Sequence, residues 1–362
     1  MSERAELIAA LEEGRQAGAW PMASLWVSAR GEVFEAAVGG AGPDTLWDLA
    51  SLTKPMVVGT LAMEAVTSGA LVLDAPIAGF EPVGSDGVVR EVAPLTWRAL
   101  LGHRAGLPAW KDLVFALPEP RSAGSAEARY AVRALVRMAA RERDVRRGVE
   151  YSDLGYLLAG MLLEERLGLD LAAQTGLGGV FLPEVVGRQV APTGWCPWRR
   201  REVALGEVHD PNAWVLGGVA GHAGLFGTAA GVGRWARGLL RRSRGEATGC
   251  RLDAIAQDVV SAFWAREQGG SWVLAWDTKS ETGSSAGTRI SHDSVGHLGF
   301  TGTSVWIDRR RDLVVVLLSN RVALGTTAIA AIKTMRPKVH DAVVAALGSI
   351  FETDETEGPE AS

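Results

Sequence analysis

Residues 47–55 read WDLASLTKP, and residues 56–69 continue as MVVGTLAMEAVTSG. The second stretch is apolar on every side and holds one glutamate as its only charge, which predicts a helix that is buried all round. Proline is tolerated only in the first turn of a helix, so Pro55 places the start of this helix near Ser51. Gly69 is typical of the position at which a helix ends. We therefore expect a buried helix with Ser51 at its N-terminal end.

Lys54 lies three residues after Ser51, which puts both side chains on one face of this helix. Burial and the positive potential of a helix N-terminus both lower the pKa of a lysine, so a neutral amine could accept the serine proton. Ser-x-x-Lys is the arrangement of acyl-enzyme hydrolases, although a chain of this length contains the pattern about once by chance. The usual lysine in such a pattern is solvated, whereas Lys54 is one of only five lysines and opens an apolar helix.

The composition is that of an ordinary globular chain of 362 residues, with 47% hydrophobic and 22% charged residues. The formal net charge is −5 and no long basic block is present, which argues against a nucleic-acid partner. Cys196 and Cys250 lack the spacing of a metal site or of a disulfide framework. We therefore expect neither a metal nor another cofactor.

Residues 1–19 predict an amphipathic, charged helix with Leu7 and Leu11 on its apolar side. The segment has neither the basic start nor the apolar centre of a secretory signal peptide. No apolar run is long enough to span a membrane. The expectation from these patterns is a soluble cytoplasmic protein without a membrane partner.

Strand patterns occupy the two ends of the chain, and helix patterns occupy its middle. Residues 24–38 alternate around Gly31 and predict a hairpin, while the apolar run 313–318 predicts a central strand. Residues 176–233 are rich in glycine and proline and predict long ordered loops around short helices. Further strands are predicted at 272–276 and 302–308, and helices at 96–101, 126–143, 154–167, 234–240 and 329–347, the last one broken near Pro337.

This order of elements predicts an α/β fold in which one sheet is built from both ends of the chain. Residues 1–95 and 240–350 would form the sheet domain, and residues 96–239 an inserted, mainly helical domain. Residues 351–362 are acidic and polar and predict a disordered tail. A cleft between the two domains is the expected place for a functional site.

Three further motifs accompany the Ser-x-x-Lys pattern. Residues 100–107 read LLGHRAGL, residues 151–153 read YSD at the start of a predicted helix, and residues 297–299 read HLG ahead of a predicted strand. With these motifs the chain resembles the serine β-lactamase-related hydrolases, which include class C β-lactamases, D,D-peptidases and esterase relatives. The motifs of that family are Ser-x-x-Lys, Tyr-x-Asn, and Lys-Thr-Gly or His-Thr-Gly in the same order, and LLGHRAGL looks like its Leu-Leu-x-His-x-x-Gly-Leu. The resemblance spans roughly residues 24–320.

The resemblance implies a penicillin-binding-protein-like fold, with an antiparallel sheet flanked by helices, and catalysis through an acyl-enzyme. Ser51 would attack an acyl carbonyl, and Lys54 would act as the base. The phenol of Tyr151 would share the proton transfer. The backbone N–H groups of Ser51 and Phe300 would form an oxyanion hole beside Gly299.

The second and third motifs imply two more residues beside the substrate. His297 would donate a hydrogen bond to the substrate from the edge of a strand. Asp153 stands where the family has an asparagine that orients the substrate and contacts the lysine. An ionised Asp153 near Lys54 would raise the pKa of the lysine and move the proton transfer toward Tyr151. Equally, Asp153 could point at the backbone and cap the helix that follows it.

Leu298 stands where the family has a threonine whose hydroxyl helps to hold a substrate carboxylate. A leucine side chain cannot form that hydrogen bond, and Thr301 or Thr303 could compensate only in part. This departure argues against penicillins and peptide C-termini as substrates.

Two other sites are weaker candidates. Residues 283–287 read GSSAG, the pattern of the α/β-hydrolase nucleophile elbow, but Ser285 is not expected between a strand and a helix as that motif requires. His209, Asp210 and His222 lie among glycines at spacings that fit no metal site, which indicates loop packing.

Three tryptophans lie in the glycine-rich segment, namely Trp195, Trp198 and Trp214. They either form the wall of an apolar acyl pocket or pack loops together. We favour the pocket, because the family places this segment beside its cleft.

These observations predict a serine hydrolase, most directly a carboxylesterase or acyltransferase that acts on small acyl esters. D,D-peptidase or β-lactamase action is the alternative within the family, and the expected cytoplasmic location argues against both because cell-wall peptides lie outside the membrane. A non-catalytic binding protein on the same fold is the alternative of another class. Intact Ser51, Lys54 and Tyr151 argue against it.

Overall fold

The computed structural model describes residues 2–80, 94–116 and 123–348, so the predicted tail at 351–362 lies outside the described residues. A six-stranded sheet has the order β2-β1-β11-β10-β9-β8, and all neighbouring strands in it are antiparallel. Its strands are β1 (Ala23–Ala29), β2 (Glu32–Val38), β8 (Asp277–Thr278), β9 (Val295–Leu298), β10 (Ser304–Asp308) and β11 (Leu313–Ser319). The prediction of one sheet from both ends of the chain is therefore confirmed.

The central pairing of this sheet joins β1 to β11, from Ala23 opposite Ser319 to Ala29 opposite Leu313. Every residue of both strands is buried. A strand that is covered on both faces has a continuous apolar sequence instead of an alternating one. Burial on both faces thus explains the apolar run 313–318, and the central strand predicted there is confirmed.

The hairpin predicted around Gly31 is also confirmed, with β1 and β2 paired along their whole length. Its turn consists of Arg30 and Gly31, whose φ angles are 47° and 89°. Two successive left-handed residues match the right-handed twist of the strands that they connect.

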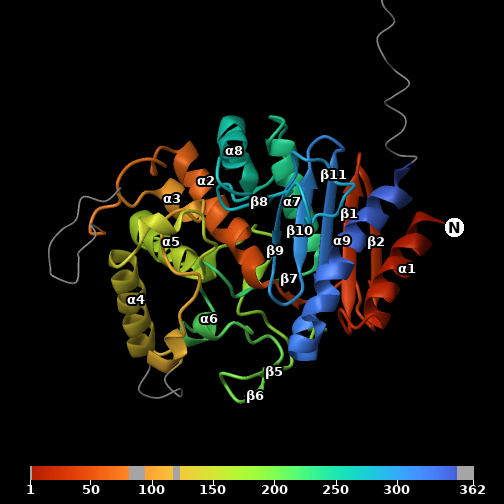
Figure 1. Cartoon of the computed structure of the whole chain (residues 1–362), viewed down its shortest axis with the longest axis horizontal. Helices are drawn as coiled ribbons and strands as arrows, with labels where there is room; N and C mark the ends of the chain where they lie inside the picture. The colour runs from red at the N-terminus through yellow and green to blue at the C-terminus, as the bar shows by residue number, and fades with distance from the viewer. Residues whose placement is uncertain (1, 81–93, 117–122, 349–362) are drawn as a thin grey trace, which may run out of the picture.

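Helices cover both faces of the sheet, as Figure 1 shows. Helices α1 (Glu3–Gln16) and α9 (Ala328–Ala346) pack together on one face, and α7 (Ala229–Arg242) packs against β1, β10 and β11 on the other. Alternate residues of β11 divide between the two layers: Val315 lies in the core with α1 and α9, whereas Val316 lies in the core with α7. The sheet is therefore the middle layer of three.

The buried helix predicted after Ser51 is present and changes its winding along its length. It begins as a 3-10 turn at Ala50–Leu52, continues as a π-helical segment at Lys54–Gly59 and ends as the α-helix α2 (Thr60–Thr67). Short π-helical segments often occur at functional sites. We call residues 50–67 the central helix. It contacts both the sheet domain and the helical part of the molecule.

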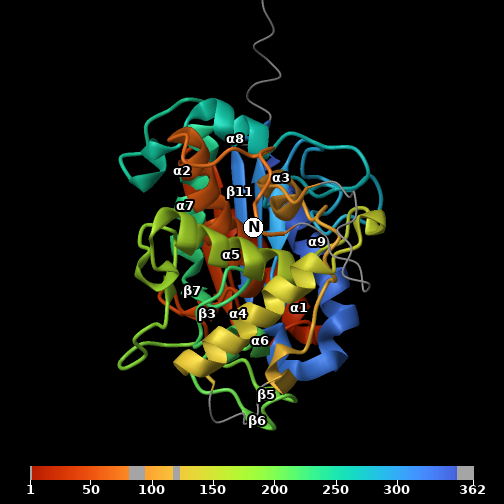
Figure 2. The same cartoon turned by 90° about the vertical axis from the view of Figure 1, so that its left-hand side faces the viewer.

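The helical part lies on the side of the molecule away from α1 and α9 (Figure 1). There α5 (Asp153–Leu167) packs against the central helix and is covered by α3 (Trp97–Leu101) and α4 (Ala126–Arg141), which Figure 2 shows from the front. The remaining elements of three or more residues in this region and beside it are the helices α6 (Pro211–Val215) and α8 (Gln257–Phe263), the strand β7 (Leu225–Gly227), and the 3-10 turns at Leu113–Ala116, Val145–Arg147, Leu171–Ala173, Arg251–Ala254 and Arg321–Thr327. The remaining strands are two residues long each: β3 (Trp47–Asp48), β4 (Val180–Phe181), β5 (Trp195–Cys196) and β6 (Arg201–Glu202).

The division into a sheet domain and an inserted domain at residues 96–239 stays a prediction. Helix α7 begins at Ala229, because the Thr228 hydroxyl accepts a hydrogen bond from Gly231 N and caps it. Since α7 packs on the sheet, the helical cover of the sheet starts before residue 240.

The strand predicted at 272–276 is wrong. Residue Trp272 forms only an isolated bridge with Asp277, and the strand β8 begins at Asp277. The chain between them makes a tight turn, in which Val273 N donates to Trp276 O at 2.9 Å and Ala275 has a φ of 68°. The apolar residues of this segment are buried in a turn, which a short apolar run cannot distinguish from a strand.

The break predicted in the closing helix is wrong as well. Helix α9 runs from Ala328 to Ala346 with Pro337 inside it. Proline removes one backbone hydrogen bond from a helix. The burial of Met335, Val339 and Val343 against the sheet holds the helix together on both sides of that position.

Within the described ranges, no helix combines the length and the apolar character that crossing a membrane requires.

We predict that Gly233→Ala destabilises the protein, because α7 approaches β1 at this glycine. A Cβ atom at Gly233 would lie 2.1 Å from the ring of Trp26, so helix and strand would have to separate. Overpacking of this kind typically costs about 1–3 kcal/mol, which urea unfolding can measure. The matched control is Gly155→Ala in α5, where the nearest atom would be 3.7 Å away. Equal free energies of unfolding for the two variants would contradict the prediction.

Candidate active site

The residues predicted from the motifs come together around Ser51. The central helix carries Ser51 and Lys54, the N-terminal end of α5 carries Asp153 with Tyr151 just before it, and β9 carries His297. Direct contacts between the central helix, α5 and β9 bring these segments together although they are far apart in the sequence.

Lys54 is fully buried and makes three hydrogen bonds through its Nζ atom. It donates to Ser51 Oγ at 2.8 Å, to Asp153 Oδ1 at 2.6 Å and to the backbone oxygen of His222 at 3.3 Å. Burial lowers the pKa of Lys54 below its ordinary value, and the negative charges of Asp153 and Asp210 oppose that shift without cancelling it. The amine is therefore placed to exchange a proton with Ser51.

Of the two interpretations of Asp153, the ion pair with Lys54 is the one observed. The residue that caps α5 is Ser152, whose hydroxyl accepts a hydrogen bond from Gly155 N at 3.1 Å. The carboxylate of Asp153 is thus free to hold the charge of a protonated Lys54. An asparagine at this position, as in the family motif, would supply no such charge.

Tyr151 lies beside the reactive groups, with Lys54 Nζ 4.9 Å from the centroid of its ring. Its ring packs against the rings of His103 and Trp272 at centroid distances of 4.6 and 4.9 Å, and those two rings also contact each other at 4.8 Å. Burial raises the pKa of Tyr151 well above its ordinary value, and Asp153 raises it further. The phenol therefore holds its proton in the resting site and can donate it.

The third motif places Phe300 at the start of a tight loop after β9, with its side chain 57% exposed. Gly299 N donates to Thr303 O at 2.8 Å, which closes the loop. Among the described residues, none accepts a hydrogen bond from the amide of Phe300. A free N–H group in this position is what an oxyanion hole requires.

The predicted role of His297 as a donor to the substrate does not fit the structure. Its Nδ1 lies 2.8 Å from the carbonyl oxygen of Leu298, so Nδ1 must carry the proton and donate it there. Burial and, to a smaller extent, the charge of Lys54 lower the pKa of His297 to about 3. A neutral ring has only one N–H group, so Nε2 is left as an acceptor.

Thr301 and Thr303 do not replace the missing hydroxyl at position 298. Both side chains are buried, and their hydroxyls donate to the carbonyl oxygens of Asp48 and Leu49 at 2.7 and 3.1 Å. Leu298 itself is half-buried at the end of β9. The site therefore presents an apolar side chain where the family motif has a hydroxyl.

His209, Asp210 and His222 act in loop packing, and this packing reaches the site. His222 Nε2 lies 2.9 Å from Asp210 Oδ1, while the backbone oxygen of His222 accepts from Lys54. Burial alone would raise the pKa of Asp210, but His222, the amide of Ala213 and Lys54 outweigh it and lower the pKa to about 2. The ionised Asp210 thus fixes the loop that holds Lys54.

Trp272 is a site residue that sequence reasoning missed. Its ring centroid lies 4.9 Å from that of Tyr151 and 5.5 Å from that of His297. Nothing in the local sequence marks it, because it reaches the site only through the turn that precedes β8.

Of the three tryptophans predicted to form a pocket wall, Trp214 stacks under the guanidinium of Arg199 at 4.9 Å, which is loop packing.

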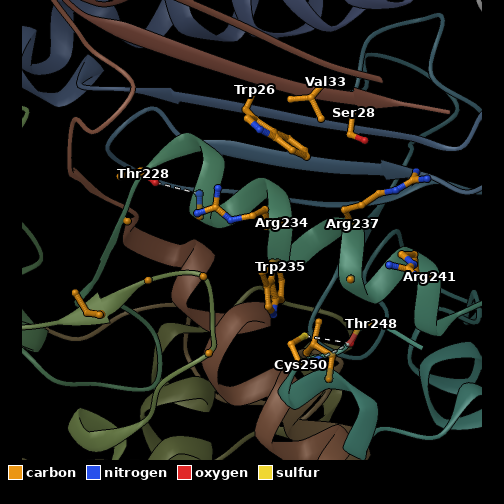
Figure 3. Close-up of a pocket in the computed structure, with 18 of the residues that line it drawn as sticks. Trp26, Ser28, Val33, Thr228, Arg234, Trp235, Arg237, Arg241, Thr248 and Cys250 are labelled. Carbon is orange, nitrogen blue, oxygen red and sulfur yellow. Dashed lines mark hydrogen bonds between the residues drawn. The ribbon is translucent and has the colours of Figure 1, made fainter. Parts of the chain in front are cut away.

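Two other features lie outside this constellation. Ser285 lies in the loop between β8 and β9 and its carbonyl oxygen accepts a hydrogen bond from His340, so the strand and helix of a nucleophile elbow are absent on either side of it. A groove of about 890 Å³ runs along α7 between Trp26 and Cys250, as Figure 3 shows. None of the motif residues lines this groove.

Comparisons with known proteins agree with this geometry. A family model described as Beta-lactamase matches residues 7–336. A putative D-alanyl-D-alanine carboxypeptidase of Escherichia coli K12 is 27% identical over 307 residues, which cover 76% of this chain and 69% of that protein.

Solved structures show the same fold. A penicillin-binding protein homologue from Caulobacter crescentus gives a TM-score of 0.66 at 19% identity, over 96% of this chain and 98% of that chain. EstCE1, described as a hydrolase with promiscuous acyltransferase activity, gives a TM-score of 0.64 at 17% identity, over 92% and 98%. The match to the family model over most of the length, with the serine and lysine in contact, shows that this chain is a serine hydrolase of the β-lactamase family.

Proposed function

We propose that the protein cleaves small, uncharged carboxylic esters through an acyl-enzyme on Ser51 and passes the acyl group to water or to another alcohol. The observation that carries the proposal is the 2.8 Å contact between Ser51 Oγ and the buried amine of Lys54. A serine is a weak nucleophile until a neighbouring base takes its proton. The lowered pKa of Lys54 suits that amine to the task.

In the first half-reaction, Ser51 Oγ attacks the acyl carbon and its proton passes to Lys54. The Asp153 carboxylate, 2.6 Å away, stabilises the ammonium group so formed. The oxyanion accepts hydrogen bonds from the N–H groups of Ser51 and Phe300. Tyr151 protonates the leaving alcohol and regains a proton from Lys54, which leaves the acyl group on Ser51.

In the second half-reaction, water or an acceptor alcohol takes the place of the leaving alcohol. Its proton passes through Tyr151 to Lys54, its oxygen attacks the acyl carbon, and Ser51 Oγ leaves with a proton returned by Lys54. Ser51 and Lys54 are already hydrogen-bonded for this exchange, and Asp153 holds the amine from another side.

The preference for uncharged esters rests on the apolar character of the site. Trp272 and Leu298 are half-buried beside Tyr151 and His297, and Phe300 is exposed at the other end of the third motif. An apolar surface with few polar groups favours an apolar acyl group. The similarity to EstCE1 in fold is consistent with acyl-ester chemistry, whereas the E. coli relative favours D,D-carboxypeptidase action as the second candidate.

Replacement of the nucleophile tests the proposal most simply. We predict that Ser51→Ala abolishes turnover of p-nitrophenyl esters and labelling by a fluorophosphonate probe, because among the described residues Ser51 supplies the hydroxyl that is hydrogen-bonded to Lys54. Ser285→Ala is the matched control and keeps both. The opposite pattern would show that the chain uses a nucleophile elbow.

Lys54 and Tyr151 are predicted to act as one unit in proton transfer. Each of Lys54→Ala and Tyr151→Phe should lower kcat by about 10² to 10⁴-fold, which is the usual contribution of general acid–base catalysis. The double variant should lose little more than either single variant, because residues that act as a unit are not additive. Losses that multiply in the double variant would contradict a shared role.

Asp153→Asn is predicted to move the acid limb of the pH profile of kcat/KM to lower pH. The charge of Asp153 raises the pKa of Lys54, so its removal lowers that pKa and keeps the amine neutral in more acidic solution. Glu150→Gln, at an exposed carboxylate three residues earlier that pairs with Arg147, is the control and should leave the limb in place. A limb that stays fixed or moves to higher pH in Asp153→Asn would mean that Lys54 is not the titrating base.

Substrate preference can be tested at position 298. Leu298→Thr should improve kcat/KM for penicillins relative to short p-nitrophenyl esters, because a hydrogen bond to a charged group contributes about 1.5–3 kcal/mol, or roughly tenfold and more. Leu298→Val has nearly the same shape as the threonine variant without the hydroxyl and should not produce this change. A wild-type enzyme that already prefers penicillins would contradict the proposal.

A further inference from the structure

A pair of residues before the nucleophile, Asp48 and Leu49, joins the two segments that would bind the oxyanion. The side chain of Asp48 is 3% exposed and accepts two backbone hydrogen bonds. Its Oδ1 accepts from Ala50 N at 2.8 Å, and its Oδ2 accepts from His209 N at 2.7 Å. This carboxylate lies outside the family motifs and takes no part in the proton transfers at Ser51.

The first of these hydrogen bonds acts on the conformation of Ala50. This residue has a φ of 47°, in the left-handed region that residues with a Cβ atom rarely adopt. Ala50 directly precedes Ser51, so its conformation sets the direction of the Ser51 N–H group. The bond from Ala50 N to Asp48 Oδ1 closes a tight turn of the Asx type, which holds Ala50 in that conformation.

The backbone of the same two residues holds the loop that carries Phe300. Thr301 Oγ1 donates to the carbonyl oxygen of Asp48 at 2.7 Å, and Thr303 Oγ1 donates to that of Leu49 at 3.1 Å. Gly299 lies so close that a Cβ atom on it would be 2.7 Å from the Leu49 carbonyl oxygen. The loop is therefore seated directly on the turn before Ser51.

We infer that Asp48 is a positioning residue for the oxyanion hole. Its carboxylate fixes the turn before Ser51. That turn directs the Ser51 N–H group and, through its backbone carbonyls, holds the loop that directs the Phe300 N–H group. This inference rests on the proposed acyl-enzyme function. The two donors come from segments about 250 residues apart, and an error of about 1 Å in such a site can lower a rate about 10²-fold. A link that holds both segments at one residue keeps the two N–H groups in register.

The charge state of Asp48 is compatible with this role. Burial raises its pKa to about 6, and the amides of His209 and Ala50 oppose the shift. At pH 8 the side chain is therefore a carboxylate, and both of its oxygens accept hydrogen bonds. The link also reaches Lys54 indirectly, because His209 precedes Asp210, whose side chain contacts His222, and the backbone oxygen of His222 accepts from Lys54.

The experiment compares turnover per functional active site at pH 8 in wild type and Asp48→Asn. Active sites are counted by the final stoichiometry of fluorophosphonate labelling, and kcat and KM are measured with a p-nitrophenyl ester. Asparagine has the shape of aspartate but turns an NH₂ group toward one of the two amide donors. We expect kcat per labelled site to fall by about 10-fold to 10²-fold with KM changed less than about threefold, as removal of one oxyanion-hole donor costs about 10²–10³.

Asp308→Asn is the matched control. Asp308 is also buried, and its carboxylate also accepts backbone hydrogen bonds, from Ser291, Arg310 and Arg311, but at the end of β10 and outside the site. This variant should lower the melting temperature and leave kcat per labelled site unchanged. A variant of Asp48 that behaves in the same way, with fewer or less stable sites that turn over at the wild-type rate, would overturn the inference.

Thr301→Val and Thr303→Val keep the test decisive if Asp48→Asn does not fold. Each removes one hydroxyl from the same link and keeps the shape of the side chain, so each should lower kcat per labelled site. Wild-type turnover per site in both would also overturn the inference. Ser51→Ala separates failure of the proposed function from failure of this inference. Turnover or labelling that persists in Ser51→Ala would refute the acyl-enzyme itself, independently of the result for Asp48.

Discussion

The site depends on one constraint, the burial of the Lys54 amine among fixed hydrogen-bond partners. Water does not reach this amine, so its pKa is governed by the residues around it. Ser51 receives one of its hydrogen bonds, Asp153 another, and the backbone of His222 the third. Because an unpartnered amine in this position would be costly, the central helix, α5 and the loop of His222 have to meet at this point.

The positions of the sheet and the helices follow from the same requirement. The central helix is apolar on all sides because other elements pack around it: β9 contacts its first turn, α5 its π-helical segment, and α8 and the 3-10 turn at Arg251–Ala254 contact α2. Its first turns carry the reactive groups, where the chain passes from β3 through the left-handed Ala50 into the helix. The loop after β9 then closes over this turn through the hydroxyls of Thr301 and Thr303.

Local patterns were sufficient to predict the elements in which the order of apolar and polar residues matches the burial of the two faces. The apolar run 313–318 predicted the central strand, and the alternation around Gly31 predicted the hairpin. The segment 272–276 was mistaken for a strand, and the helix around Pro337 was expected to break, because distant packing decided both. A single sequence carries little information on such packing.

The same limit applies to the site. Ser51, Lys54 and Tyr151 were predicted because their spacing and motifs are local, and their roles stay predictions. The tautomer of His297 and the contribution of Trp272 could not be predicted, since both depend on atoms far along the chain. Asp48 stands in the opening motif itself, but its role is visible only once His209 N is found 2.7 Å from its carboxylate.

The most direct measurement is the identification of the covalent intermediate. Wild-type protein is mixed with p-nitrophenyl acetate, quenched in acid during the first turnovers, digested, and analysed by tandem mass spectrometry. We predict that one acetyl group per chain is found on Ser51 and that it disappears as the substrate is exhausted. An acetyl group on Ser285, or p-nitrophenol release with Ser51 unmodified throughout, would contradict an acyl-enzyme built on Ser51 and Lys54.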